Sequence, residues 1–249
     1  MCKKTASSIF KDKTNIYVSE CLSTNDFLTN YVKKNPQEEG IIIISDFQIK
    51  GKGQRANTWQ SDRGKNLLFS FLVKPELSVN YQFKLHIITS ISIIRTLSKV
   101  GIHDAKIKWP NDIYIRDKKV SGILIESQVS RRKITQSIIG IGLNINQTQF
   151  NRLNATSTYN ELNINLDIKN TLKIFCTFFD EEYLRVNDDI KSLKNNYIRN
   201  LYQLNKEIKF TYEKNILSGR IVDIDQEGSL VISSNGNKEK FNFGSISFI

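Results

Sequence analysis

The segment Gly51–Ala56, with the sequence GKGQRA, combines closely spaced glycines with basic side chains. Backbone amides next to glycine can approach an anion closely, and Lys52, Arg55 and the following Arg63 add positive charge. The segment therefore predicts an anion site, although a solvated basic loop would have the same composition. Its spacing also matches the dinucleotide fingerprint GxGxxG/A. We exclude a Rossmann site, because the next residues, NTW, continue the loop where that fingerprint requires a helix.

Three further polar segments accompany this loop. Ser23–Asn25 reads STN, Lys108–Asp112 reads KWPND, and Lys119–Glu126 reads KVSGILIE. Together with Gln48, the tryptophan that ends the loop, KNLLFS, GIGLNIN and the C-terminal FNFGSIS, this ordered set resembles the biotin protein ligases. KWPND followed by KxxGILxE is the most specific part of the resemblance, whereas STN alone would carry no weight.

The resemblance implies a two-step reaction. ATP activates biotin to biotinyl-5′-adenylate, and the biotinyl group then passes to one lysine of a biotin carboxyl carrier domain of acetyl-CoA carboxylase or a related carboxylase. ATP and biotin are then substrates, Mg²⁺ accompanies them, and no resident metal is expected. The motifs imply Lys119 and Lys52 as catalytic residues. The implied biotin contacts are Ser23, Thr24, Asn25, Gln48, Lys52, Gly53, Gln54 and Lys119, and the implied nucleotide contacts are Arg55, Trp59, Asn111 and Asn144.

The chemistry of these residues is compatible with that reaction. The biotin carboxylate attacks the α-phosphate and a carrier lysine attacks the mixed anhydride, so both nucleophiles come from substrates and no catalytic triad is required. The enzyme must hold anions together and stabilise the charge that develops on the phosphate, which suits Lys52 and Lys119. Hydroxyl and amide groups can match the donors and acceptors of the ureido ring. Lys108 and Asp112 form a candidate ion pair that supports the site.

The glycine-rich loop departs from the family's commoner arginine-rich pattern. Lys52 and Gln54 stand where arginines are common, and Ala56 stands where glycine is usual. Lysine keeps the charge but loses the bidentate fork of arginine, and glutamine loses the charge. We therefore expect weaker retention of the adenylate without loss of activity. We also expect the loop Gln48–Gly64 to be mobile until ligand phosphate orders it.

Composition excludes several other classes. The 249 residues, 39% of them hydrophobic, suffice for a buried core without disulfide or metal. Cys2, Cys21 and Cys176 lie far apart, which indicates free thiols in a reducing cytoplasm. Two histidines without HExxH spacing argue against a metal hydrolase. The longest aliphatic run, Ile41–Ile44, is far shorter than the roughly 20 residues of a membrane span, and no signal-peptide core is present. We expect a cytoplasmic protein without membrane contact.

The net charge of +11 is compatible with a nucleic-acid partner. Because lysines are spread along the whole chain, solvated faces explain most of this charge, and a nucleic-acid-binding regulator remains the alternative from another class. Some biotin ligases carry an N-terminal winged helix-turn-helix of about 60 residues. The STN motif at Ser23 leaves no room for it, so we expect the form without it and no specific DNA site. The enzymatic alternative is a lipoate protein ligase, against which Gln48 and STN favour a ureido ring. A homodimer remains open.

Hydrophobic periodicity predicts the elements that position these residues. The expected strands are Asn15–Ser19, Ile41–Ser45, Leu67–Val73, Ala105–Trp109, Ile113–Ile115, Lys119–Gln128 and Lys133–Asn146. The expected helices run from the STN segment to about Lys34, and over Tyr81–Lys99, Ile168–Arg185 and Asp189–Tyr202. We expect the last four strands to be antiparallel neighbours and Gln147–Asn165 to be irregular.

From about Asn205 the pattern changes to short strands and turns. Strands are expected at Glu207–Tyr212, Leu217–Ile224, Gly228–Ser233 and Lys240–Phe243, with a hairpin turn at Asn235–Gly236. The chain is therefore predicted to be α+β, with a mixed, largely antiparallel sheet, packed helices and a small β unit. The resemblance implies a catalytic domain over 1–204, of the class II aminoacyl-tRNA synthetase-like, biotin/lipoate ligase type, and an SH3-like β-barrel over 205–249.

Overall fold

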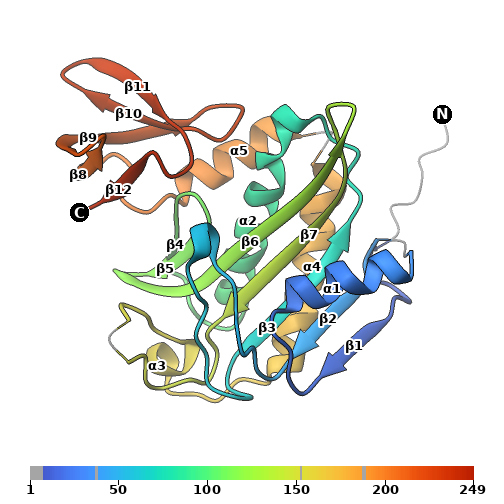
Figure 1. Ribbon diagram of the computed structural model, residues 1–249. Helices are drawn as coiled ribbons and strands as arrows, with labels where there is room; N and C mark the ends of the chain where they lie inside the picture. The colour runs from blue at the N-terminus through green and yellow to red at the C-terminus, as the bar shows by residue number, and fades with distance from the viewer. Residues whose placement is uncertain (1–7, 37–38, 152, 187–188) are drawn as a thin grey trace.

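Seven strands form one mixed sheet in the larger part of the molecule. The computed structural model describes residues 8–36, 39–151, 153–186 and 189–249 (Figure 1). The strands are β1 (Asn15–Val18), β2 (Ile42–Ser45), β3 (Leu67–Val73), β4 (Ala105–Lys108), β5 (Asp112–Ile115), β6 (Lys118–Ser130) and β7 (Lys133–Leu143). Their order is β1-β2-β3-β7-β6-β5-β4, and β1 with β2 is the only parallel pair of strands described. The predicted mixed, largely antiparallel sheet is confirmed, as are the four antiparallel neighbours β4 to β7.

Helices cover both faces of this sheet. They are α1 (Thr24–Lys34), α2 (Phe83–Lys99), α3 (Thr158–Leu162), α4 (Ile168–Arg185) and α5 (Ile190–Arg199). α1 connects the parallel strands β1 and β2, and Leu28 and Val32 pack it on one face. α2 and α4 lie against the other face, where Phe69 of β3 meets Phe175 of α4 at a ring-centroid distance of 5.2 Å. Because both faces are covered, all seven residues of β3 are buried, and the strand reads as an apolar run.

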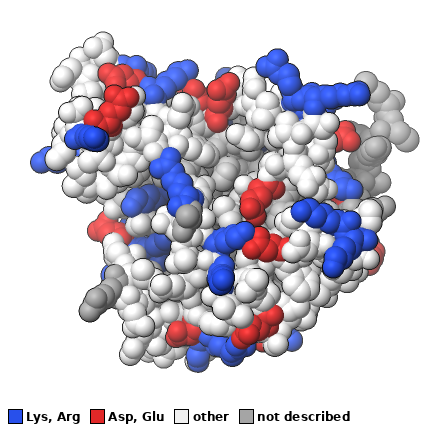
Figure 2. All heavy atoms as spheres, in the orientation of Figure 1, with Lys and Arg blue, Asp and Glu red and all other residues white. Residues whose placement is uncertain are grey.

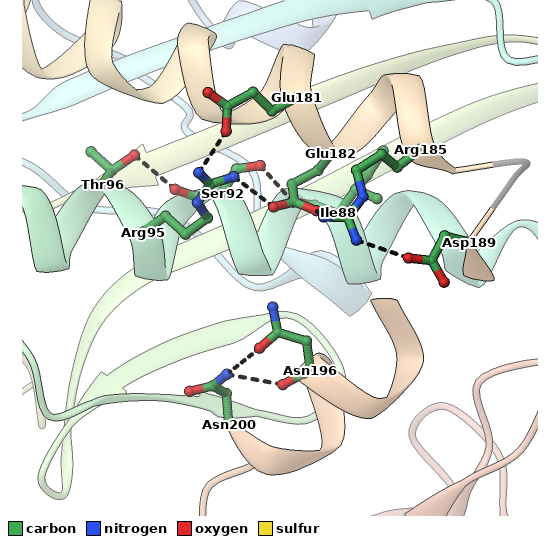
Figure 3. Close-up of polar contacts among 10 residues, drawn as sticks. All are labelled: Ile88, Ser92, Arg95, Thr96, Glu181, Glu182, Arg185, Asp189, Asn196 and Asn200. Atoms are coloured by element: carbon green, nitrogen blue, oxygen red, sulfur yellow. Dashed lines mark hydrogen bonds and ion pairs between the residues drawn. The ribbon is translucent and has the colours of Figure 1, made fainter. Parts of the chain in front are cut away.

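Arg95 joins α2 to α4. Its guanidinium lies 2.5 Å from a carboxylate oxygen of Glu181 and 2.6 Å from one of Glu182 (Figure 3). The Glu182 side chain is only 4% exposed and also lies 3.6 Å from Arg185. A buried carboxylate without a cation would be strongly destabilising, so these contacts fix how α4 packs on α2.

Residues after 206 form a second sheet of five antiparallel strands. They are β8 (Glu207–Tyr212), β9 (Asn215–Ile224), β10 (Leu230–Ser234), β11 (Asn237–Phe241) and β12 (Ile246–Phe248), in the order β11-β10-β9-β8-β12. The predicted turn between β10 and β11 is present, with positive φ at Asn235 (49°) and Gly236 (81°) as a type I′ turn requires. This unit is consistent with the implied SH3-like barrel. The proposed boundary between residues 204 and 205 stays a prediction.

Two elements were missed from the sequence. The expected irregular segment 147–165 contains α3, a short helix capped by Ser157, whose hydroxyl accepts from Asn160 N (3.1 Å). Five residues are too few to show helical periodicity. β12 has three residues and pairs with β8, which no local pattern reveals. Cys21 and Cys176 are free, and Cys2 lies outside the described residues. None of the described helices is long and apolar enough to cross a membrane.

Aromatic side chains pack the second sheet against the first unit. Trp109 Nε1 donates a hydrogen bond to Gly228 O (2.8 Å). The Phe243 ring lies 5.4 Å from that of Phe83, 5.6 Å from that of His86 and 5.3 Å from that of Trp109. Gly228 has φ 94°, and an added methyl group would overlap the Phe83 ring, so glycine is required there. The strand that follows Phe243 is thereby held beside the larger unit.

Candidate active site

A cavity of about 420 Å³ lies between the N-terminus of α1, the glycine-rich loop, strands β6 and β7, and the last strand of the chain. This volume is typical of small-molecule sites. The predicted site residues that line it are Ser23, Thr24, Asn25, Gln48, Lys52, Gly53, Gln54, Arg55, Trp59, Asn111 and Lys119. Asn144 is not among the lining residues. The fold therefore brings nearly all of the motif residues to one cavity.

A connected polar network forms part of the cavity wall. Thr24 donates to Gln48 Oε1 from its backbone N (2.8 Å) and from its hydroxyl (3.0 Å). The Ser70 hydroxyl lies 2.7 Å from Thr24 Oγ1 and 2.6 Å from Asn25 Oδ1. Asn25 Nδ2 in turn donates to Glu126 Oε2 (2.7 Å). Because these side chains hold one another, their donors and acceptors meet a ligand in fixed positions.

Ser70 and Glu126 were not among the predicted site residues. Ser70 lies in the middle of β3, in the sequence LLFSFLV, and is fully buried. A single hydroxyl in an apolar strand is the signal that could have identified it, because a buried hydroxyl needs a partner. Ser23 takes the N-cap position of α1 without a side-chain capping bond, so the helix does not use its hydroxyl.

Three glycines in strands β6 and β7 leave the sheet without side chains where it borders the cavity. Gly140 and Gly142 lie on β7, and Gly122 of β6 is the register partner of Gly142. A methyl group added at Gly140 would overlap Asn25 Oδ1, and one added at Gly142 would overlap the Trp59 ring. A methyl at Gly122 would lie 3.1 Å from the same ring. The glycines therefore allow Asn25 and Trp59 to lie directly against the sheet.

Lys119 places a cation in the cavity wall. Its Nζ lies 2.6 Å from Asp112 Oδ1 and 5.6 Å from the centroid of a Trp59 ring. The backbone is fixed on both sides, since Lys119 N donates to Asn154 O (3.1 Å) and Thr156 N donates to Lys119 O (2.9 Å). The Lys119 side chain is 30% exposed, so an anion that enters the cavity can reach it.

The prediction of an ion pair between Lys108 and Asp112 is wrong. The two residues are register partners on β4 and β5, yet Asp112 pairs with Lys119. Lys108 Nζ instead donates to Tyr114 Oη (3.1 Å) and lies 4.5 Å from the centroid of that ring. Tyr114 projects from the same face of β5 as Asp112, because side chains two positions apart share a face. Burial lowers the pKa of Lys108.

The glycine-rich loop is a narrow hairpin. Trp59 N donates to Gly51 O (2.8 Å), and Gly53 N donates to Asn57 O (2.7 Å). The short 3₁₀ turn η1 (Gln54–Ala56) forms its tip. Backbone bonding thus defines the path of the loop before any side chain is considered.

Lys52 of this hairpin is held by α1. Its Nζ lies 2.5 Å from Asp26 Oδ1, and this hydrogen bond raises the pKa of Lys52. The two side chains are 46% and 38% exposed. Because exposed ion pairs contribute little to stability, the ammonium can transfer from Asp26 to a ligand anion at small cost.

The structure directs Arg55 toward the C-terminal unit. Its Nη2 donates to Phe243 O (3.0 Å), and its predicted nucleotide contact stays a prediction. Gln54 lines both the active-site cavity and a second cavity of about 480 Å³ beside the C-terminal unit. The C-terminal segment contributes four lining residues that were not among the predicted site residues: Gly244, Ile246, Ser247 and Phe248. They reach the cavity only through tertiary packing.

The side chains of two predicted nucleotide contacts donate hydrogen bonds to the backbone. Asn111 lines the cavity, and its Nδ2 donates to Ile123 O (2.9 Å), while its backbone carbonyl accepts from Ile123 N (2.9 Å). Asn144 is 3% exposed, and its Nδ2 donates to Thr156 O (2.9 Å). Asn144 therefore supports the segment that bonds to Lys119, and direct contact with a nucleotide stays a prediction.

The lining residues fit a magnesium ion that arrives with a nucleotide. Within the described part of the chain, no group of three or more His, Cys, Asp and Glu side chains could hold a metal ion. Mg²⁺ commonly binds through one or two carboxylates together with substrate phosphates and water. Asp112 is the one carboxylate among the described lining residues, next to Asn111.

Charges of both signs surround the site. Figure 2 shows Lys and Arg side chains interspersed with Asp and Glu over this face, rather than gathered in one continuous basic patch. A nucleic-acid-binding face would have Lys and Arg clustered in a patch or stripe. The face that carries the cavity therefore does not have that footprint.

The comparisons with known proteins agree with this geometry. The chain matches the model of the biotin/lipoate A/B protein ligase family over residues 18–144, and that of the biotin protein ligase C terminal domain over residues 204–249. The bifunctional ligase/repressor BirA of Escherichia coli (strain K12) is 27% identical over 236 residues, which are 90% of this chain and 71% of that protein. BirA of Bacillus subtilis (strain 168) is 30% identical over 128 residues, and the match spans 51% of this chain and 39% of that protein.

A solved structure shares the same arrangement. Biotin protein ligase from Aquifex aeolicus in complex with biotin and ATP is similar with a TM-score of 0.79 and 26% identity, over 95% of this chain and 98% of that chain. The first family model covers 127 of the 249 residues, from 18 to 144, and includes every motif that lines the cavity outside the C-terminal unit. The chain belongs to the biotin/lipoate A/B protein ligase family.

Proposed function

We propose that this chain is a biotin protein ligase, which forms biotinyl-5′-adenylate from biotin and ATP and transfers biotin to a lysine of a biotin carboxyl carrier domain. One arrangement supports this most directly. Lys119 begins the cavity-facing part of β6, whereas Asn25 contacts Leu124 O (3.4 Å) and Glu126 further along the same strand. Leu124 lies five residue steps after Lys119 along the strand, about 16 Å. An elongated ligand with a polar head and an anionic tail suits this spacing.

The residues support a reaction in which both nucleophiles come from the substrates. A biotin carboxylate oxygen attacks the α-phosphorus of ATP, and pyrophosphate leaves. In the second step the carrier lysine amine attacks the carbonyl carbon of the mixed anhydride, loses a proton, and AMP leaves. Lys119 stabilises negative charge on the carboxylate and the phosphate, and Lys52 joins it after leaving Asp26. Mg²⁺ bound to the nucleotide would add charge neutralisation beside Asp112 and Asn111.

The polar network favours biotin over lipoate. A ureido ring offers two N–H groups and a carbonyl oxygen to the Thr24, Asn25 and Gln48 side chains. The dithiolane of lipoate offers neither, so lipoate would gain none of these hydrogen bonds, each of which contributes about 0.5 to 1.5 kcal/mol. The A. aeolicus relative is described with biotin and ATP, which supports the same assignment for this chain.

The acceptor and the assembly belong to the same proposal. The family match supports a carrier domain of a biotin-dependent carboxylase, such as acetyl-CoA carboxylase, as the acceptor. We propose no specific DNA partner, since the charges around the cavity are mixed. A homodimer stays an open alternative, and a cytoplasmic location stays a prediction.

Two measurements test the proposed function. Isothermal titration with biotin and with lipoate should show binding of biotin and at least tenfold weaker binding of lipoate. Mass spectrometry of a carrier domain incubated with the protein, biotin and MgATP should show the mass of one added biotinyl group. Preferential binding of lipoate, or an unmodified carrier domain, would refute the proposal.

A further inference from the structure

Arg55 joins the glycine-rich loop to the C-terminal unit. Its Nη2 donates to Phe243 O (3.0 Å). The next residue, Gly244, has φ 68°, and a methyl group added there would overlap the Arg55 guanidinium. The guanidinium therefore packs directly on the Gly244 backbone. A side chain at position 244 would force it away.

The loop presents Arg55 from a defined backbone position. Arg55 has φ 55° and ψ 47°, a left-handed conformation that is unfavourable for a residue with a side chain. Such a conformation persists where the surrounding structure over-determines it. Here the bonds between Gly53 and Asn57 and between Trp59 and Gly51 fix the hairpin. The contact with Phe243 then fixes its tip.

The contact connects two walls of the same cavity. Gly53 and Gln54 line the cavity from the loop, and Ile246 and Phe248 line it from the C-terminal strand. The loop belongs to the larger unit and the C-terminal strand belongs to the second sheet. The two walls can therefore separate if the contact between them is lost. Arg55 is placed where it can prevent that separation.

We propose that Arg55 is a positioning residue that fastens the glycine-rich loop to the C-terminal unit and so retains the ligand in the closed cavity. This inference rests on the proposed function. Because Arg55 holds the walls rather than the reacting atoms, its loss should accelerate ligand release and raise the KM for biotin. The effect on ligand release should exceed the effect on the chemical step, since Lys119 and the polar network keep their contacts.

The first test compares two substitutions of Arg55. Arg55→Asn removes the guanidinium and tolerates the left-handed backbone. It should release the adenylate on the order of five- to tenfold faster, the range expected for losing one exposed charged hydrogen bond. Single-turnover adenylate formation at saturating biotin and ATP should change by a smaller factor than the release rate, and a larger change would place Arg55 at the reacting groups instead of at the contact. Arg55→Lys keeps the charge but loses the fork, so its release rate should be intermediate.

The second test removes the same contact from the other side. Gly244→Ala should displace the guanidinium and accelerate release to a similar extent. If the two residues act through one contact, the double variant Arg55→Asn/Gly244→Ala should release no faster than the faster single variant. Multiplied effects would mean that the two residues act independently, which would overturn the proposal.

Hydrogen exchange of the ligand-free protein tests the contact without relying on activity. Arg55→Asn should accelerate exchange of the Gly53 amide, which depends on the closed hairpin, by about five- to tenfold. Arg63→Ala is the matched control, because Arg63 lies on the same loop but contacts Ser19 O and Glu20. Equal exchange in wild type and Arg55→Asn would refute the contact, even if the protein proved to have another substrate. Inactivity towards biotin would refute only the proposed function.

Discussion

At the residue scale, the absence of a side chain at Gly140 leaves the space in which Asn25 joins the polar network. A methyl group there would overlap Asn25 Oδ1, so Gly140→Ala should displace the amide from Ser70 and Glu126. We expect biotin affinity to fall at least tenfold in isothermal titration, about 1.4 kcal/mol. In an Asn25→Ala background the same substitution should cause little further loss, because the side chain it displaces is gone. A full loss in that background would mean that Gly140 acts elsewhere.

Lys119 is proposed to act in catalysis and also forms an ion pair with Asp112, and the two roles can be tested separately. Lys119→Ala should lower pyrophosphate release with biotin about a hundredfold or more, since it removes transition-state charge stabilisation. It also leaves Asp112 without its cation, 2.6 Å away, and should lower the unfolding free energy by about 1 kcal/mol. The double variant Lys119→Ala/Asp112→Asn should recover that stability in urea unfolding without recovering the rate. A normal rate in Lys119→Ala would exclude the catalytic role.

Gln54 stands where an arginine is common in the family, and we expect this to shorten the life of the bound adenylate. A charged hydrogen bond to phosphate contributes about 1.5 to 3 kcal/mol and a neutral amide about 0.5 to 1.5. Gln54→Arg should therefore slow adenylate release several-fold in stopped-flow measurements. Arg55 would not compensate, because its guanidinium is engaged at Phe243. Equal or faster release would show that position 54 does not control retention.

At the element scale, the sequence predicted what depends on local pattern. β3, α4 and β8 have the predicted limits, because apolar residues repeat there at strand or helix spacing. α3 and β12 were missed, because five-residue and three-residue elements carry no period. The same distinction holds in the site. Asn25 and Lys119 belong to contiguous motifs, whereas Phe248 reaches the cavity through packing of the C-terminal unit, and Ser70 joins the polar network through tertiary contact with Asn25. The partner of Asp112 was mispredicted because strand register pairs it with Lys108 of β4, whereas its side chain contacts Lys119 of β6, which lies opposite Tyr114.

The hairpin of the glycine-rich loop offers a prediction about order. Trypsin can cleave after Lys52, Arg55 and Arg63, and all three residues are exposed. Biotin with MgATP should slow cleavage at Lys52 and Arg55, because bound phosphate adds contacts to those that already hold the hairpin. Cleavage at Lys34, the last residue of α1, serves as the internal reference. Equal cleavage of the loop with and without the ligands would argue against ligand-induced ordering.

At the scale of the whole molecule, the C-terminal unit is part of the active site. Trp109 of the KWPND motif donates to Gly228 O, Arg55 donates to Phe243 O, and Phe248 lines the cavity. Neither unit alone encloses a ligand on all sides. The function of the larger unit therefore depends on how firmly the two units pack. His86 lies at the contact between them, beside Phe83 and Phe243.

His86 makes this packing sensitive to acid. Its ring stacks on Phe83 at 5.5 Å and meets the edge of Phe243 at 5.6 Å, and burial lowers its pKa from 6.5 to about 4. The unfolded chain therefore binds a proton between pH 6.5 and 4 that the folded protein does not, so the stability due to neutral His86 is complete above pH 6.5 and is lost progressively towards pH 4.

Between pH 7.5 and 5 this linkage should lower the unfolding free energy by about 2 kcal/mol. His86→Phe keeps an aromatic ring between Phe83 and Phe243 but cannot take up a proton. Urea unfolding of both proteins at the two pH values measures the difference, and carboxylates and His103 cancel because both proteins contain them. The wild type should lose about 2 kcal/mol more than the variant on acidification. Equal losses would mean that His86 is protonated in the folded protein and that water reaches the contact between the two units.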